Sequence, residues 1–210
     1  MKLFFLVCFT IFTSLSYAAL PSQAGESFSA QMNIAKNSSQ PMGARWKALL
    51  LASDLATSDQ IDEIREFTKS SEWFMRNAAM TALNQVAPDY GIDAAKKLIS
   101  DKALVVRSAA IELIATKPTI ENRHLLAAEL SKPYNFNGRK SLWIRSKIVQ
   151  HLADRATADD RTFFSRELFD RDPEIAEIAA QTLEKITNVN FTGDQQLARW
   201  KTYIKAKNWN

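Results

Sequence analysis

The chain has 210 residues, of which 46% are hydrophobic and 24% are charged, and its formal net charge is +4. These ordinary globular values exclude wholesale disorder. Five glycines and six prolines are too few for a β-sandwich or barrel with frequent turns. One cysteine and two histidines exclude a disulfide scaffold and a multi-cysteine zinc site, and argue against a histidine-rich metal site.

Residues 1–18 have the layout of a secretory signal peptide. Lys2 is followed by about 13 mostly apolar residues, and small side chains precede a cleavage point after Ala18. The apolar run is shorter than the roughly 20 residues that span a bilayer, although an uncleaved anchor is the alternative. We expect cleavage, which removes Cys8, and export to the periplasm or the medium. The mature chain has no second long apolar run, so we expect no stable membrane insertion after cleavage.

Residues 19–40 are rich in serine, glutamine and asparagine, and Phe28 and Met32 are their only clear apolar anchors. Such a composition is typical of a poorly ordered chain terminus. We therefore expect a partly disordered leader here, with room for one frayed helix.

A segment of similar sequence then recurs along the chain. Its aligned position is occupied by Arg45, Arg76, Arg107, Arg145 and Ala176, so the intervals are 31, 31, 38 and 31 residues. Apolar residues in each segment lie at helical spacing, and further amphipathic stretches lie between the segments. The pattern predicts an all-α fold, an α-solenoid in which antiparallel helix pairs stack and bury a continuous core.

The repeats span residues 41–187. Beyond them Leu197, Trp200 and Ile204 lie at i, i+3 and i+7, the spacing of one more amphipathic helix. We expect residues 188–210 to supply a C-terminal capping helix, because the last pair would otherwise expose an apolar face.

Two segments carry a resemblance to a known family. Asp101-Lys-Ala-Leu-Val-Val-Arg107 and the segment that starts at Asp170 and reaches Ala176 resemble HEAT repeats of the short, phycobilisome-lyase-like kind. Repeats of that family carry an aspartate in the turn between their helices and an arginine six residues later. The resemblance covers roughly residues 42–187 and implies a HEAT-like superhelix. It implies little about function, because such arrays serve many roles.

The repeated arginines would form a ladder along the stack. They could bind an anion on the inner surface, or bond the aspartate and carbonyl groups of a neighbouring turn. We favour the structural reading, in which Asp101 pairs with Arg107, whereas Ser70 offers Arg76 no carboxylate. Arg139 replaces the aspartate before the fourth arginine. The ladder residues are Arg45, Arg76, Asp101, Arg107, Arg145 and Asp170.

Residues 130–153 contain no acidic residue. The seven residues that lengthen one repeat interval lie inside this stretch, within 132–139, and insertions in repeat proteins often form binding loops. Aromatic side chains beside cations suit an anionic or aromatic partner. The alternative is a solvated loop whose aromatics pack back on the array. The candidate binding residues are Tyr134, Phe136, Arg139, Lys140, Trp143 and Lys147.

Motifs of enzyme chemistry are absent from the sequence. His124 and His151 lie 27 residues apart, and the chain has neither a G-x-S-x-G nor an H-E-x-x-H motif nor a glycine-rich phosphate loop. We therefore predict no catalytic residues, no metal ligands and no cofactor.

The sequence favours an exported, non-catalytic scaffold that binds a protein or peptide partner in the cell envelope, an anionic one if the basic loop makes the contact. The alternative is a HEAT-like enzyme, either a chromophore lyase or a DNA glycosylase. Both of these act inside cells, so the signal peptide argues against them, and we expect no nucleic-acid partner. A third reading is a purely structural part of an envelope assembly.

Overall fold

The computed structural model describes residues 27–209, and within them the chain is predominantly helical, with a single two-residue hairpin ladder. This confirms the prediction of an all-α fold. The proposed signal peptide and residues 19–26 lie outside the described residues. The α-helices are α1 (Phe28–Lys36), α2 (Met42–Leu55), α3 (Ile61–Glu66), α4 (Trp73–Val86), α5 (Pro88–Leu98), α6 (Leu104–Ala115), α7 (Ile120–Glu129), α8 (Ile144–Asp154), α9 (Arg161–Glu167), α10 (Pro173–Thr187) and α11 (Gln196–Lys207). The short elements are the 3₁₀ turns η1 (Ser58–Gln60), η2 (Phe67–Lys69), η3 (Pro133–Asn135) and η4 (Ala158–Asp160) and the strands β1 (Phe136–Asn137) and β2 (Lys140–Ser141).

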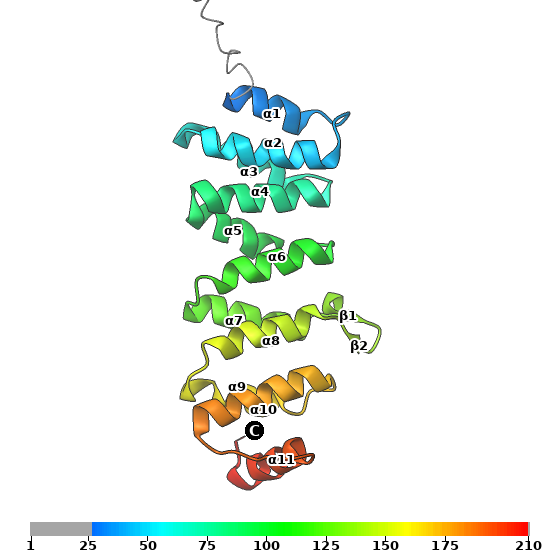
Figure 1. Cartoon of the computed structure of the whole chain (residues 1–210), viewed down its shortest axis with the longest axis vertical. Coiled ribbons are helices and arrows are strands. Elements are labelled where there is room, and N and C mark those ends of the chain that lie inside the picture. The colour runs from blue at the N-terminus through cyan, green and yellow to red at the C-terminus, as the bar shows by residue number, and fades with distance from the viewer. Residues whose placement is uncertain (1–26, 210) are drawn as a thin grey trace, which may run out of the picture.

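The helices form an elongated stack (Figure 1). Helices α2, α4, α6, α8 and α10 follow one another along the long axis, each packed on the next, and we call them the front layer. Helices α3, α5, α7 and α9, the rear layer, return the chain between them. Every front-layer helix therefore begins at the same edge of the stack, on the right in Figure 1, which we call the turn edge. Helix α1 covers one end of the stack and α11 the other.

Helix α1 lies where the sequence predicted a partly disordered leader. The Ser27 Oγ accepts a hydrogen bond from the Ala30 N–H at 3.1 Å and caps the helix, because a serine oxygen replaces the missing intrahelical acceptor. Phe28, Met32 and Ala35, at i, i+4 and i+7, are buried, and α1 packs on α2. The packed helices therefore begin at residue 28 rather than 41. Three apolar side chains in an otherwise polar segment are enough to dock α1 on α2.

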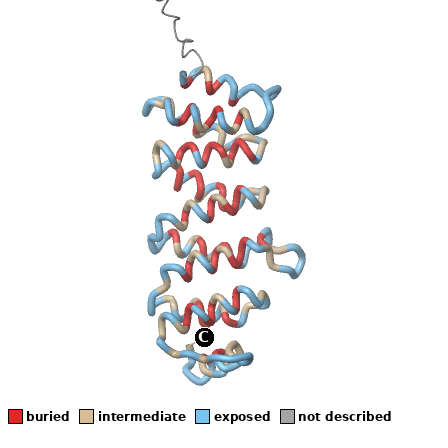
Figure 2. Tube along the Cα trace, in the orientation of Figure 1, coloured by how far each residue is buried: buried red, intermediate tan, exposed pale blue. Residues whose placement is uncertain are grey.

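Buried residues run along the middle of the stack, and exposed ones lie at its edges and on the hairpin (Figure 2). Small side chains set the distance between helices. In α4, for example, Ala78, Ala79 and Ala82 are completely buried. The closest approach is at Gly91 of α5, where an added Cβ would lie 2.5 Å from the Cα of Asn84. Glycine is needed there because the two helix backbones nearly touch.

The C-terminal segment closes the other end of the stack. Helix α11 packs on α10, and its Trp200 and Ile204 are completely buried. Phe191, in the connection before it, packs edge-on against Trp200 with ring centroids 5.1 Å apart. Helix α10 itself ends at Asn188, whose φ of 57° is a conformation that asparagine tolerates better than most residues.

Candidate binding site at the hairpin

The repeated arginines are buried and link each turn to the next. Arg45 shows the pattern: its Nε donates to the carbonyl of Ala35, the residue before the end of α1. Its two terminal nitrogens donate to both carboxylate oxygens of Glu72, in the next turn of the turn edge, at 2.7 and 2.6 Å. Such a bidentate pair fixes geometry as well as supplying energy. The guanidinium therefore holds two successive turns together.

Arg76 makes the most buried of these pairs. Its Nε and one terminal nitrogen donate to the carboxylate of Asp101 at 2.5 and 2.7 Å, and only about 7% of either side chain is exposed. Its other terminal nitrogen donates to the carbonyls of Ser70 and Ser71 in its own turn. Burial alone would raise the pKa of Asp101. The hydrogen bonds from Arg76 and the Ala103 N–H, with the positive charge of Arg76, outweigh it and lower that pKa.

The expected pairing of Asp101 with Arg107 was wrong. The Asp101 carboxylate accepts from Arg76 of the preceding repeat, and Arg107 donates only to the backbone carbonyl of Asp101, at 2.7 Å. Arg107 instead donates forward to the side-chain oxygen of Asn135 at 3.2 Å and to the carbonyl of Tyr134 at 2.8 Å. The turn aspartate thus bonds backward along the stack, because the arginine six residues later points toward the following turn.

Arg145 repeats the pattern at the fourth position. It donates to the Leu130 carbonyl, to the Ser141 hydroxyl and to both carboxylate oxygens of Asp170, the last at 3.3 and 2.6 Å. Its guanidinium carbon lies 4.5 Å from the centre of the Phe136 ring. The ladder ends in α10, where buried Ala176 replaces the arginine and, within residues 27–209, no further front-layer turn follows.

The inserted segment has a structural part and an exposed part. Its first half, η3, supplies the two acceptors of Arg107, and Asn135 is completely buried and also donates to the Glu129 carbonyl at 2.9 Å. The Tyr134 hydroxyl donates to the Glu129 carboxylate at 2.6 Å, and burial followed by this bond raises the pKa of Tyr134 well above its usual range. The second half is the β1–β2 hairpin, which turns at Gly138 with a φ of 61°.

The six candidate binding residues therefore lie on different sides of the hairpin. Tyr134, Trp143 and Lys147 face the α6 side: Tyr134 lies against Arg107, and Lys147 forms an ion pair with Glu112 and lies 5.5 Å from the Trp143 ring centre. The other three, Phe136, Arg139 and Lys140, line a cavity on the α10 side. The inserted segment thus presents two surfaces rather than one.

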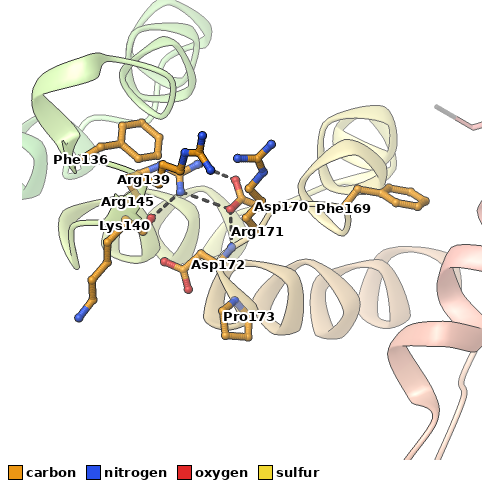
Figure 3. A pocket seen from close by; sticks show the side chains of 11 residues that line it. Phe136, Arg139, Lys140, Arg145, Phe169, Asp170, Arg171, Asp172 and Pro173 are labelled. Carbon is orange, nitrogen blue, oxygen red and sulfur yellow. Dashed lines mark hydrogen bonds and ion pairs between the residues drawn. The ribbon is translucent and has the colours of Figure 1, made fainter.

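The α10-side cavity has a volume of about 640 Å³ and lies between the hairpin and the turn that joins α9 to α10. Figure 3 shows the Arg145–Asp170 pair between the two, with Lys140 extending away from it. Arg139, Lys140 and Arg171 line this cavity, are exposed, and form no ion pair with any residue of the range 27–209. The cavity, hereafter the hairpin cavity, is therefore basic and has three cations free to bind an anionic group.

Arg171 and Phe169 were missed by the sequence analysis. Both line the hairpin cavity, and Phe169 also lies 5.6 Å from the Lys201 ammonium and 5.8 Å from that of Lys205, both in α11. The available signal was positional: Arg171 directly follows the ladder residue Asp170 in the turn that faces the insertion. The cavity is also lined by two carboxylates, Asp170, which is paired with Arg145, and Asp172, and Glu167 lies close to Asp170. Asp172 caps α10, and Glu167 has its pKa raised, first by burial and then by repulsion from Asp170.

The two histidines are not brought together. His124 is exposed and lines a second cavity of about 670 Å³, at the edge opposite the turn edge, with Arg155 and Arg166, whereas His151 is half-buried in α8. Within the described residues, no cluster of three or more His, Cys, Asp or Glu side chains is placed to hold a metal ion. Over the same residues, no helix combines the length and apolarity needed to cross a bilayer.

A scan against protein-family models and a search of curated proteins found no match to this chain.

Proposed function

We propose that the protein is an exported, non-catalytic scaffold, an α-solenoid of HEAT-like repeats that binds a protein or peptide partner in the cell envelope. The regular arginine ladder and the stacked front layer support the repeat architecture, since each unit contacts its neighbours in the same way. The basic hairpin supports a binding role. Its exposed half, residues 137–140, contributes cations that the stack does not use.

The observation that carries this proposal is that three exposed cations, Arg139, Lys140 and Arg171, line one cavity. Three exposed cations without a paired carboxylate repel one another, so they give a site that gains by binding an anion. The Phe136 ring beside them offers apolar contact. An acidic side chain or a C-terminal carboxylate of a peptide fits this combination.

Affinity capture tests the proposal. The mature chain, residues 19–210, is crosslinked in its own envelope extract, and recovered proteins are compared with those from Arg139→Ser/Lys140→Ser. We expect the double variant to lose the partner, and the wild type to release it as salt is raised. The matched control is Lys47→Ser/Lys97→Ser, which removes two exposed lysines elsewhere on the stack that form no ion pair with described residues. Equal recovery of the partner by the two variants would show that the hairpin cavity is not the binding site.

Export has its own test. N-terminal sequencing of protein from its native compartment should begin within a residue or two of Ala19, because small residues precede that bond. Recovery of an intact Met1 from the cytosol would contradict export.

A further inference from the structure

The turn edge exposes large apolar side chains at the start of successive front-layer helices. Met42 begins α2 and is 52% exposed, Trp73 begins α4 and is 41% exposed, and Val105 lies at the second position of α6 and is 45% exposed. Trp143, directly before α8, is 52% exposed. These helices begin along one edge of the stack (Figure 1), so the four residues are spread over four successive turns of that edge, and we call them the apolar row. Solvation of such a row is unfavourable, so it is a candidate contact surface.

Exposed cations accompany this row. The turn carboxylates Glu72, Asp101 and Asp170 are neutralised by the ladder arginines, so they contribute no net negative charge. The remaining acids of these turns that are not buried and form no ion pair with a described residue are Glu167, at the end of α9, and Asp172 and Glu174, at the start of α10. The same turns carry five exposed cations that form no ion pair with a described residue, so positive charge is in excess. These are Lys102, Lys132, Arg139, Lys140 and Arg171. The turn edge is therefore apolar, aromatic and basic.

We propose that the turn edge rests on the surface of an anionic lipid bilayer. Tryptophan is favoured at the boundary between headgroups and acyl chains, because its ring is apolar and its N–H needs a polar partner. Lysine and arginine keep their charge at the level of the lipid phosphates while their stems cover apolar surface. The contact is peripheral and needs no membrane-spanning helix.

A bilayer fits this row better than a folded protein does. The apolar row is spread over the turns from α2 to α8, and the unpaired cations lie in the turns before α6, α8 and α10, whereas a protein hot spot is a compact buried pocket. A planar surface with evenly distributed negative charge contacts all the turns at once. The proposal concerns a different ligand from the partner of the hairpin cavity. The two surfaces share Arg139, Lys140 and Arg171. Trp73 and Val105 lie outside the inserted segment, so their variant tests the turn edge alone.

Vesicle flotation with the mature chain tests the proposal. We expect about tenfold or greater enrichment on phosphatidylglycerol-containing vesicles over pure phosphatidylcholine ones, falling as salt is raised. Trp73→Ser/Val105→Ser should lose most of this binding and keep partner capture. The control, Leu55→Ser/Ile120→Ser, removes two apolar side chains from the opposite edge that are at least as exposed as Trp73 and should bind like wild type. Circular dichroism checks that both variants are folded.

A second measurement uses the wild-type chain, so it does not depend on how the variants fold. Lipids brominated near the headgroup should quench part of the total tryptophan fluorescence, because Trp73 and Trp143 are exposed, and should leave the contribution of the completely buried Trp200. Equal flotation of the two variants, absence of quenching, or binding to soluble polyglutamate without binding to vesicles would each overturn the proposal. The last result would indicate an acidic protein as the ligand of this edge.

Discussion

At the scale of single residues, the arginine ladder shows how hydrogen-bond acceptors offset the desolvation cost of a buried charge. Each guanidinium enters a site that already offers carbonyl oxygens from its own turn and an acceptor from the next. For three of the four arginines, the acceptor in the next turn is a carboxylate. Arg107 is the exception, since it donates to the neutral side chain of Asn135 and to the carbonyl of Tyr134. The pairs therefore differ in what remains when the arginine is removed.

Arg76→Ala should destabilise the fold more than Arg107→Ala, the reverse of what the sequence suggests. Removing Arg76 leaves the Asp101 carboxylate buried and unpaired, which typically costs about 3–5 kcal/mol. Removing Arg107 leaves only neutral acceptors unsatisfied, for about 1–3 kcal/mol. Urea unfolding of both variants measures the difference, with Lys102→Ala as the exposed control. A greater loss for Arg107→Ala would contradict the observed pairing.

Stability should pass through a maximum as the pH falls from neutrality. Glu167 has a raised pKa in the folded state, so its protonation favours folding, and that gain is complete below its unfolded value of about 4.3. Asp101 and Asp170 have lowered pKa values, so their contribution is present above about pH 3.9 and is lost below it. Urea unfolding across a pH series should show the rise and then the fall.

The Glu167→Gln variant isolates the first part of this curve. Because the amide does not titrate, the rise between neutrality and about pH 4.3 should disappear, and the acid loss from the aspartates should remain. A rise that persisted in the variant would assign the effect to another group.

At the scale of elements, the sequence predicted helices well because their apolar residues repeat at one spacing. The failures have two physical causes. Helix α1 was expected only as a frayed helix in a leader, because its burial depends on packing against α2 rather than on its own polar composition. The insertion was read as a single exposed loop, although Asn135 is completely buried, because sequence spacing does not show which acceptor a distant arginine such as Arg107 needs.

Packing between elements gives a further prediction, at Gly91. Glycine to alanine in a helix interior usually stabilises by about 1 kcal/mol. Here the added Cβ would lie 2.5 Å from the Asn84 Cα, so α4 and α5 must move apart, and overpacking of this kind costs about 1–3 kcal/mol. We expect Gly91→Ala to lower the midpoint of thermal unfolding.

The control for this prediction is Gly43→Ala in α2. Gly43 has no atom within 4 Å of its would-be Cβ, so alanine there should be neutral or stabilising. If Gly91→Ala stabilised the protein as much as Gly43→Ala, the close approach of α4 to α5 would be wrong.

At the scale of the whole molecule, the stack depends on its ends because each unit is covered only by its neighbours. Both ends use a helix with large side chains on one face: Phe28 and Met32 in α1, Trp200 and Ile204 in α11. The periodicity of Leu197, Trp200 and Ile204 predicted the second cover. The hairpin cavity could be predicted only in part, since Arg171 reaches it from a turn that the chain visits about 30 residues after the hairpin.

Removal of residues 194–210 should open one end of the stack. It would expose Phe191 and the face of α10 that α11 covers, at about 1.5–3 kcal/mol for each fully exposed side chain. Since each kcal/mol of lost stability lowers the melting temperature of a domain of this size by about 2–4 °C, the loss should be measurable by circular dichroism.

In the full-length chain, Trp200→Ala should lower the free energy of unfolding by about 3–5 kcal/mol, because removal of the completely buried ring leaves a cavity. The control for Trp200→Ala is Arg199→Ala, which changes an exposed neighbour on the same helix. An unchanged melting temperature after truncation would show that α11 does not stabilise the stack.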